Sequence, residues 1–135
     1  MIRTINDLDR PYLYSIIEKV FKTTYIRDNL FANWYVYIVY DKIVGFILYD
    51  AIYEKAEIEY IYVDKKYRNN KIATKLVNKM IENLIKKEIN SITLEVNSRN
   101  IGAIEFYKMN KFTEVAVRKN YYGKDDAILM MRSWW

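Results

Sequence analysis

The chain contains no cysteine and no histidine among its 135 residues, and it has only three glycines and one proline. Without cysteine and histidine it can form no disulfide, no thiol nucleophile, no Cys/His zinc site and no Ser-His-Asp triad. None of its serines stands in a nucleophile-elbow pattern. Any chemistry must therefore use Glu, Asp, Tyr, Lys or backbone groups, and we expect no metal site.

Long apolar runs are also lacking. No stretch approaches the ~18 consecutive apolar residues of a membrane-spanning helix. The N-terminal segment, Met1 to Asp7, has the pattern of neither a signal peptide nor a transit peptide. The content of 52% hydrophobic and 29% charged residues is typical of a soluble globular protein. We therefore expect one domain over residues 1–135, a cytoplasmic location and no membrane partner.

The charge balance is positive. The chain has 22 Lys and Arg residues against 17 Asp and Glu residues, a formal net charge of +5. This surplus fits an anionic ligand, but a basic surface serves nucleic acid, an acidic peptide or a polyphosphate cofactor equally well. Charge alone does not choose among them.

Hydrophobic periodicity predicts alternating strands and helices in the order βαα-βββ-α-β-α-ββ. Gly45 lies inside a strand pattern and indicates a bulge or a close backbone approach. The mixed order predicts one central sheet with helices on its faces. The expected strands cover 2–5, 34–40, 43–53, 56–63, 91–96, 112–119 and 127–132, the expected helices cover 8–22, 25–31, 72–85 and 100–109, and a loop covers 120–126.

One segment is more informative than the rest. A strand pattern ending at Asp64 is followed by the basic turn 67–71 and then by an amphipathic helix. Unpaired N–H groups and the positive dipole end of that helix would meet at the turn. Such a place suits a phosphate or pyrophosphate, although a solvated strand-to-helix connection is the simpler interpretation of the turn alone.

The residues that follow resemble a known family. The segment Leu94 to Phe112, with Glu-Val at a strand end and an Asn-x-x-Ala-Ile-x-x-Tyr helix, resembles the second half of the GNAT acetyltransferase signature. The turn resembles that family's pyrophosphate loop, Arg/Gln-x-x-Gly-x-Gly/Ala. Arg68 and Ala73 match, whereas Lys71 and Asn69 stand where glycines are common. Backbone amides make the contact, so these residues can serve if they reach positive φ, which Asn tolerates well.

The resemblance narrows at the C-terminal end. Arg118 to Tyr122 and Asp125 to Met130 are similar to the end of protein N-terminal acetyltransferases, above all the bacterial ribosomal-protein alanine N-acetyltransferases of the RimI type. In all, the similarity covers about residues 56–130. The stretch before Trp34 is shorter than in those enzymes and lacks their Pro-Trp segment, which bears on the acceptor more than on the reaction.

The resemblance implies an α/β fold of the GNAT acyl-CoA N-acyltransferase type: a mostly antiparallel sheet with one splayed parallel strand pair and helices on both faces. It implies acetyl-CoA as cofactor, with the pantetheine arm pairing as a local strand. The cofactor contacts that it implies are Ile61, Tyr62 and Val63 on the strand, Arg68, Asn69, Asn70, Lys71, Ile72, Ala73 and Thr74 in the loop and helix start, and Asn100, Ala103 and Tyr107.

The resemblance also implies roles in catalysis. Glu95, twelve residues before Tyr107, matches the family's general base acting through water, and Tyr107 matches the acid that protonates the leaving thiolate. Glu59 is a rival base, and Tyr121 and Tyr122 would close over the acceptor. Without the resemblance, the simpler interpretations are structural. Glu95 would be a carboxylate at the rim of the site, Tyr107 would be an aromatic residue of the core, and Glu59 would follow from the alternation of side chains along a half-exposed strand.

We therefore expect an acetyl-CoA-dependent N-acetyltransferase that acts on the N-terminal α-amine of a protein, with a ribosomal protein as leading candidate. One rival is an acetyltransferase for small amines such as polyamines, aminoglycosides or amino acids. The other is a catalytically silent basic binding module of the same fold. The enzyme needs no direct nucleic-acid contact and is a monomer or a homodimer, in which Trp134 and Trp135 pack on the core or contact a second copy.

Overall fold

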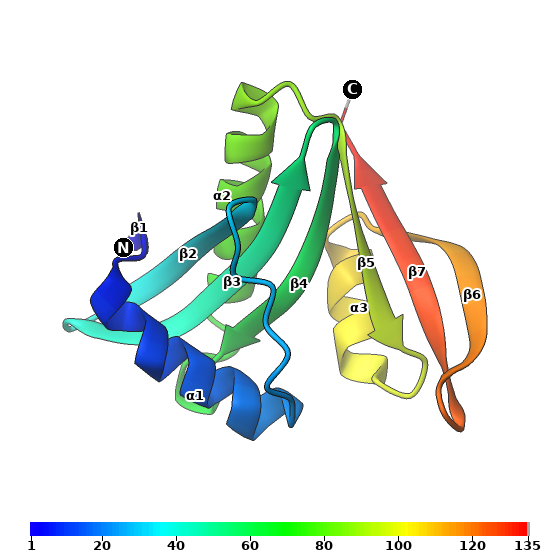
Figure 1. Ribbon diagram of the computed structural model, residues 1–135, viewed down its shortest axis with the longest axis horizontal. Coiled ribbons are helices and arrows are strands. Elements are labelled where there is room, and N and C mark those ends of the chain that lie inside the picture. Colours follow the sequence, from blue (N-terminus) through cyan, green and yellow to red (C-terminus); the bar gives the residue numbers. More distant parts are fainter. Residues whose placement is uncertain (135) are drawn as a thin grey trace.

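The computed structural model describes residues 1–134 and contains one seven-stranded sheet in the order β1-β2-β3-β4-β5-β7-β6 (Figure 1). The strands are β1 (Ile2–Thr4), β2 (Ala32–Val39), β3 (Lys42–Ile52), β4 (Lys55–Val63), β5 (Ser91–Asn97), β6 (Thr113–Tyr122) and β7 (Asp125–Ser133). The helices are α1 (Arg10–Phe21), α2 (Ile72–Lys86) and α3 (Ile101–Met109), with short 3-10 turns η1 (Asp7–Asp9) and η2 (Lys65–Tyr67).

Every neighbouring strand pair in the sheet is antiparallel except β4 and β5, which run parallel. The predicted fold class, a mostly antiparallel sheet with one parallel pair and helices on both faces, is confirmed. In Figure 1, α1 lies in front of the sheet, whereas α2 and α3 lie behind it.

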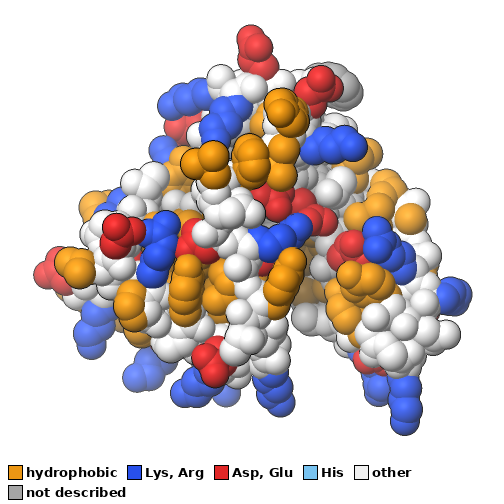
Figure 2. Space-filling model, in the orientation of Figure 1, with side chains coloured by type: hydrophobic (Ala, Val, Ile, Leu, Met, Phe, Trp, Pro, Cys, Tyr) orange, Lys and Arg blue, Asp and Glu red, His pale blue; other side chains and the backbone are white. Residues whose placement is uncertain are grey.

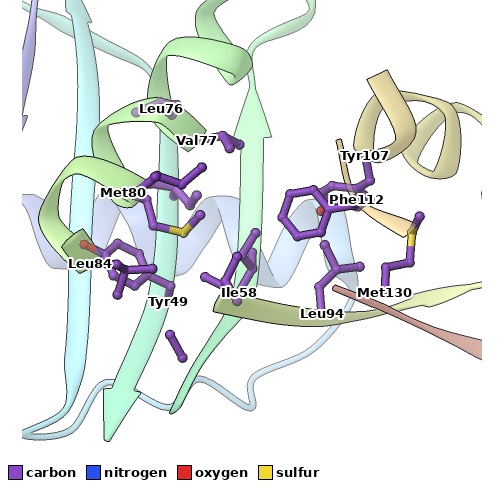
Figure 3. Packing of buried hydrophobic residues seen from close by; sticks show 14 of the residues in the cluster. Tyr49, Ile58, Leu76, Val77, Met80, Leu84, Leu94, Tyr107, Phe112 and Met130 are labelled. Atoms are coloured by element: carbon purple, nitrogen blue, oxygen red, sulfur yellow. The ribbon is translucent and has the colours of Figure 1, made fainter. Parts of the chain in front are cut away.

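The two faces of the sheet carry separate apolar clusters. The front cluster packs Leu13 and Ile17 of α1 on Trp34, Phe46 and Leu48 of the sheet. The rear cluster continues from α2 across the parallel strand pair to α3 (Figure 3). Its labelled members in Figure 3 are Tyr49, Ile58, Leu76, Val77, Met80 and Leu84 on the α2 side and Leu94, Tyr107, Phe112 and Met130 on the α3 side.

Two segments differ from what local sequence patterns predicted. The expected helix over 25–31 is absent, because the amide of Arg27 donates to the Glu59 carboxylate at 2.8 Å instead of to a helical carbonyl. The expected loop over 120–126 is instead a tight turn at Gly123, whose φ of +78° favours glycine. Tyr121 and Tyr122 therefore belong to β6.

Gly45 of β3 allows a close approach, as its position in a strand pattern suggested. A Cβ atom there would lie 3.0 Å from the carbonyl oxygen of Tyr62 and 3.4 Å from a methyl of Ile72. The glycine thus lets the end of β4 and the start of α2 pack tightly on β3.

The C-terminal end of β7 leads to Trp134, whose indole N–H donates to the carbonyl of Ile89 at 3.1 Å and whose ring packs on the rear cluster. Trp135 lies outside the described residues. Within residues 1–134, none of the helices is long and apolar enough to cross a membrane.

Candidate active site

The parallel strands β4 and β5 separate almost as soon as they meet. Glu57 and Thr93 form the only registered pair between them in the described residues. From Ile58 to Val63, β4 is paired with β3 on one edge but no longer with β5 on the other. Ile61, Tyr62 and Val63 therefore lie where backbone groups are open to an extended ligand. Figure 2 shows a notch between the two halves of the molecule at this open end.

The predicted anion site lies at the end of β4. The Arg68 guanidinium donates to the carbonyl of Val63 at 3.1 Å, which holds the turn against the strand end. The first α2 residues, Ile72, Ala73 and Thr74, have N–H groups with no carbonyl of their own helix to bond. No side chain caps this N-terminus and no acidic residue lies in its first turn. The positive end of the α2 dipole is therefore not neutralised by a side chain, so it can attract an anion.

The two residues that replace glycines in the turn adopt the conformation that glycine would favour. Asn69 has φ +67° and Lys71 has φ +61°. Asn70 stabilises the turn by donating its side-chain amide to the carbonyls of Tyr67 and Arg68 at 3.2 and 3.3 Å. The backbone thus reaches left-handed geometry without glycine, at a steric cost of about 1–2 kcal/mol for the lysine.

Helix α3 borders the open end from the other side. The side-chain oxygen of Asn100 accepts from the Ala103 amide at 3.2 Å and caps the helix, which leaves the Asn100 NH₂ group to donate elsewhere. Ala103 and Tyr107 are one turn apart and share a face. Tyr107 is 8% exposed and packs edge-on against Phe106 and Phe112. Burial alone raises the pKa of its phenol, so Tyr107 stays protonated at neutral pH.

Glu95 lies on β5 between two residues of the rear cluster, so its side chain belongs to the front face. The side chain is 18% exposed, and its Oε2 atom is buried without a hydrogen bond. The nearest charge is Arg118 of β6, whose Nε lies 3.5 Å from that oxygen. This contact is an ion pair that lacks hydrogen-bond geometry.

Glu59 lies at a bulge in β4. Leu48 of β3 pairs with Tyr60 and Tyr49 pairs with Ile58, so Glu59 has no partner across the ladder. Its side chain is 6% exposed, and burial raises the pKa of its carboxyl despite the nearby Arg27. One oxygen accepts from the Arg27 amide, whereas the other is buried without a hydrogen bond. The rival bases thus share a feature: each has one unsatisfied buried oxygen.

Arg27 connects the segment after α1 to three carboxylates of the sheet. It lies 2.7 Å from Glu57, 3.5 Å from Asp50 and 3.6 Å from Glu59. Burial also raises the pKa of the Asp50 carboxyl. A cavity of about 730 Å³ lies beside this group, where β4 and β5 meet, and not at the open end of the strand pair. It is lined by Arg27, Asp50, Ile52, Tyr53, Glu54, Lys55, Ala56, Glu57 and Thr93.

Aromatic side chains border the front of the site. Tyr121 and Tyr122 contact each other edge-on at 5.0 Å between ring centres. Burial raises the pKa of the Tyr122 phenol, and the charges of Glu95 and the neighbouring tyrosines, including Tyr60 of β4, raise it further. Tyr122 therefore interacts electrostatically with the Glu95 carboxylate. On the α1 side, Phe21 packs against Tyr60 at 4.8 Å.

Arg27 and Arg118 both lie against the candidate bases, but no pattern in the sequence indicates a role for either. Arg118 stands in the C-terminal motif, beside the two tyrosines that carry the resemblance. Arg27 lies in a segment with no motif, and only the folded chain brings it to Glu57 and Glu59. Among residues 1–134, no group of three or more His, Cys, Asp or Glu side chains is arranged to hold a metal ion.

Comparisons with known proteins point to the same family as the sequence motifs. Residues 2–112 match the model of the Acetyltransferase (GNAT) family. The ribosomal protein bS18-alanine N-acetyltransferase of Escherichia coli K12 is 31% identical over an alignment of 93 positions, which covers 66% of this chain and 63% of that protein. The chain thus matches less than two thirds of that relative's length. The enzyme of the same name from Haemophilus ducreyi is 26% identical over an alignment of 141 positions, gaps included, which covers 96% of this chain and 97% of that protein.

Solved structures show the same fold. The ribosomal-protein-S18-alanine N-acetyltransferase from Escherichia coli has a TM-score of 0.87 and 23% identity, over 98% of this chain and 92% of that one. Ard1 from Thermoplasma volcanium has a TM-score of 0.86 and 25% identity, over 100% and 97% of the two chains. An aminoglycoside 6'-N-acetyltransferase complexed with coenzyme A has a TM-score of 0.87 and 18% identity, over 98% and 96%.

Proposed function

Because the chain belongs to the Acetyltransferase (GNAT) family, we propose that it transfers an acetyl group from acetyl-CoA to the N-terminal α-amine of a protein, with a ribosomal protein as leading acceptor. The observation that carries the proposal is the early separation of β4 and β5. The open edge of β4 leads to the uncapped N-terminus of α2. The relatives named as alanine N-acetyltransferases support the choice of acceptor.

The residues present fit the cofactor. The amides of Ile72, Ala73 and Thr74 point their unpaired dipoles to one place, and Arg68 and Lys71 add positive charge beside it. The open edge of β4 from Ile61 to Val63 offers peptide groups to an amide-containing arm. Bound there, acetyl-CoA would supply the thioester carbonyl that an amine attacks.

The protein's own groups would then move two protons. The acceptor amine must lose a proton to become a nucleophile. The Glu95 carboxylate faces the acceptor side and would take that proton through a water molecule. A free α-amine has a pKa of ~7.7–8.0 against ~10.4 for lysine, so deprotonating it is easier by roughly 3.4 kcal/mol. Tyr107, buried and protonated on the opposite side, gives a proton to the departing thiolate.

Glu59 is the alternative base, since burial raises the pKa of its carboxyl and makes it a better proton acceptor than an exposed glutamate. Its Oε2 atom is buried and without a hydrogen bond. Replacing each carboxylate with its amide separates the two roles. If Glu95 is the base, kcat falls by about 10²-fold in Glu95→Gln, and the Glu59→Gln variant keeps most of it.

A second candidate function, acetylation of a small polyamine, is favoured by one observation. The cavity beside Arg27 carries the carboxylates of Asp50, Glu54 and Glu57, which suit a chain of ammonium groups. Arg27 and Lys55 line the same cavity, however, and their charges oppose such a ligand. The front of the open end is bordered by Tyr121 and Tyr122, which suit a peptide better.

The test has two parts. Acetyl-CoA should raise the melting temperature by ligand linkage, and an unchanged melting temperature at saturating cofactor would favour the silent-module alternative. Mass spectrometry of peptides that differ in their first residues, incubated with enzyme and acetyl-CoA, then identifies the acceptor. Acetylation of spermidine without acetylation of any peptide N-terminus would favour the small-amine function.

A further inference from the structure

Arg118 of β6 lies between a candidate base and a candidate acceptor contact. Its Nε is 3.5 Å from Oε2 of Glu95, and its guanidinium carbon is 5.3 Å from the ring centre of Tyr121. Its side chain is 57% exposed, whereas the Glu95 side chain is 18% exposed. The arginine therefore covers the carboxylate from the solvent side.

The contact with Tyr121 requires an irregular strand. In a regular strand, residues three apart point to opposite faces, so Arg118 and Tyr121 would not meet. Here the ladder between β6 and β7 passes from Arg118 opposite Ala127 to Tyr122 opposite Asp125, which leaves a bulge of extra residues in β6. Asp126 holds this bulge by accepting from the amide of Asn120 at 2.9 Å. The bulge brings Tyr121 over the guanidinium.

Charge explains why the arginine matters to Glu95. A buried carboxylate oxygen that accepts no hydrogen bond from the protein is costly unless an opposite charge is near. Arg118 is the cation that lies within ion-pair distance of Glu95 in the described residues. Tyr122 of β6, the same strand as Arg118, also interacts electrostatically with Glu95, but its phenol brings no positive charge.

We propose that Arg118 is a positioning residue for acetyl transfer: it holds the Glu95 carboxylate in place at the acceptor face and links its position to Tyr121. This inference rests on the proposed role of Glu95. Because the arginine contacts neither α2 nor the pyrophosphate turn, its loss should affect turnover and acceptor use, and leave acetyl-CoA affinity nearly unchanged.

The first test is a double-mutant cycle in kcat. Arg118→Gln should lower kcat about tenfold and change the KM for acetyl-CoA less than about twofold. Arg118→Lys keeps the charge, so its kcat should lie within about threefold of the wild-type value. In a Glu95→Gln background, Arg118→Gln should lower kcat by less than about twofold further. An equal tenfold loss in both backgrounds would show that the arginine acts independently of Glu95 and would overturn the inference.

The matched control is Lys119→Gln. It removes one positive charge from the adjacent position of β6, but Lys119 pairs with Asp126 and not with Glu95. Its kcat should equal that of the wild type. A loss in Lys119→Gln as large as that in Arg118→Gln would mean that only the net charge of the strand matters, which contradicts positioning.

A second readout does not need activity. The midpoint of urea unfolding should fall in Arg118→Gln, and the same substitution should leave the midpoint unchanged when Glu95 is already Gln. If the wild type acetylates no amine while this coupling is present, the proposed function fails and the contact between Arg118 and Glu95 stands. If the two substitutions act additively on the midpoint, the inference fails whatever the activity.

Discussion

The two sides of the open strand pair are built in different ways. The side formed by β4, the pyrophosphate turn and α2 offers backbone groups: an unpaired strand edge and the N–H groups of a helix start. The front side, where the acceptor would lie, is built from charged side chains, with Arg27 and Arg118 held against carboxylates. Backbone sites tolerate substitution because any residue supplies an amide, whereas ion-paired sites depend on particular side chains.

This difference would allow the turn to bind a pyrophosphate without the usual glycines. Lys71 and Asn69 keep the left-handed geometry, and the helix dipole does not depend on which residues they are. On the front side no such freedom exists. Glu59 and Glu95 each have one buried oxygen without a hydrogen bond. Replacing the neighbouring arginine would therefore leave the full cost of burying the carboxylate charge uncompensated.

The largest expected effect belongs to Tyr107→Phe, which removes a side-chain hydroxyl of α3 and so tests a side-chain role proposed on the cofactor side. We expect kcat to fall by about 10²–10⁴-fold, because a buried, protonated phenol would no longer give a proton to the thiolate. Acetyl-CoA affinity, measured by calorimetry, should change little. The control is Tyr49→Phe, which removes a phenol from the same cluster, bonded to Asn83 at 2.6 Å, and should leave kcat intact. Equal turnover in wild type and Tyr107→Phe would remove the acid role.

Thr74→Asp tests whether the helix N-terminus is the anion site. A carboxylate in the first turn of α2 should stabilise the helix by about 0.3–1 kcal/mol. The same charge should weaken acetyl-CoA binding about tenfold, because it repels the pyrophosphate. Opposite signs for stability and affinity are the expected signature, measured by urea unfolding and calorimetry. Asn78→Asp, one turn further along the same helix, should change affinity much less. Unaltered affinity in Thr74→Asp would place the anion elsewhere.

Asp28→Asn tests the side-chain construction of the front. Burial disfavours the Asp28 charge, but hydrogen bonds from Arg10, Tyr14 and Trp34 outweigh it and lower the pKa of the carboxyl. The folded protein therefore binds the proton less readily than the unfolded chain. The stabilisation is present above the unfolded pKa of about 3.9 and is lost as the pH falls through the folded value.

Asp28→Asn should therefore lower the free energy of unfolding by about 1–3 kcal/mol at pH 7 and by less near pH 3. Urea unfolding at both pH values measures the difference. Asp41→Asn, at the exposed turn between β2 and β3, serves as control and should change stability little at either pH. A loss of stability in Asp28→Asn that does not vary with pH would show that the carboxylate charge is unimportant.

The smallest expected effect belongs to Lys71→Gly. Removing a Cβ at φ +61° should stabilise the protein by about 0.5–1 kcal/mol, since the steric relief exceeds the added freedom of the unfolded chain. Acetyl-CoA affinity should change less than about fivefold, because the amides carry the contact. Lys87→Gly, at φ −88° after the same helix, relieves no strain and should not stabilise. A large loss of affinity in Lys71→Gly would instead assign the contact to the lysine charge.

The order of strands and helices was predictable because the spacing of apolar residues, and the residues that favour turns and helix ends, can be read from short stretches of sequence. The amphipathic pattern of α2 began and ended within one residue of the observed helix. The segment 25–31 was not predictable in this way. The amide of Arg27 bonds to Glu59 and the side chain of Asp28 to Arg10, contacts between residues far apart in the sequence. No window on the sequence contains both partners.

The candidate site divides along the same line. The turn, Asn100 and Tyr107 follow a spaced motif, so the sequence alone could propose them as ligand contacts. The position of Arg118 over Glu95 depends on the pairing of β5, β7 and β6 in space and on a bulge that only the folded strand reveals. Tertiary pairing therefore determines the acceptor side, and local pattern determines the cofactor side.

A sheet joined by one residue pair has a mechanical consequence. Within residues 1–134, the four strands β1 to β4 and the three strands β5 to β7 share a single registered contact, between Glu57 and Thr93, and the apolar layer that includes Ile58 and Leu94 also joins them. A ligand lying between the halves would act as an added strand and complete hydrogen bonding across the divide. Ligand binding would then also make the whole molecule more rigid, so the ligand-free enzyme would deform more easily than the ligand-bound enzyme.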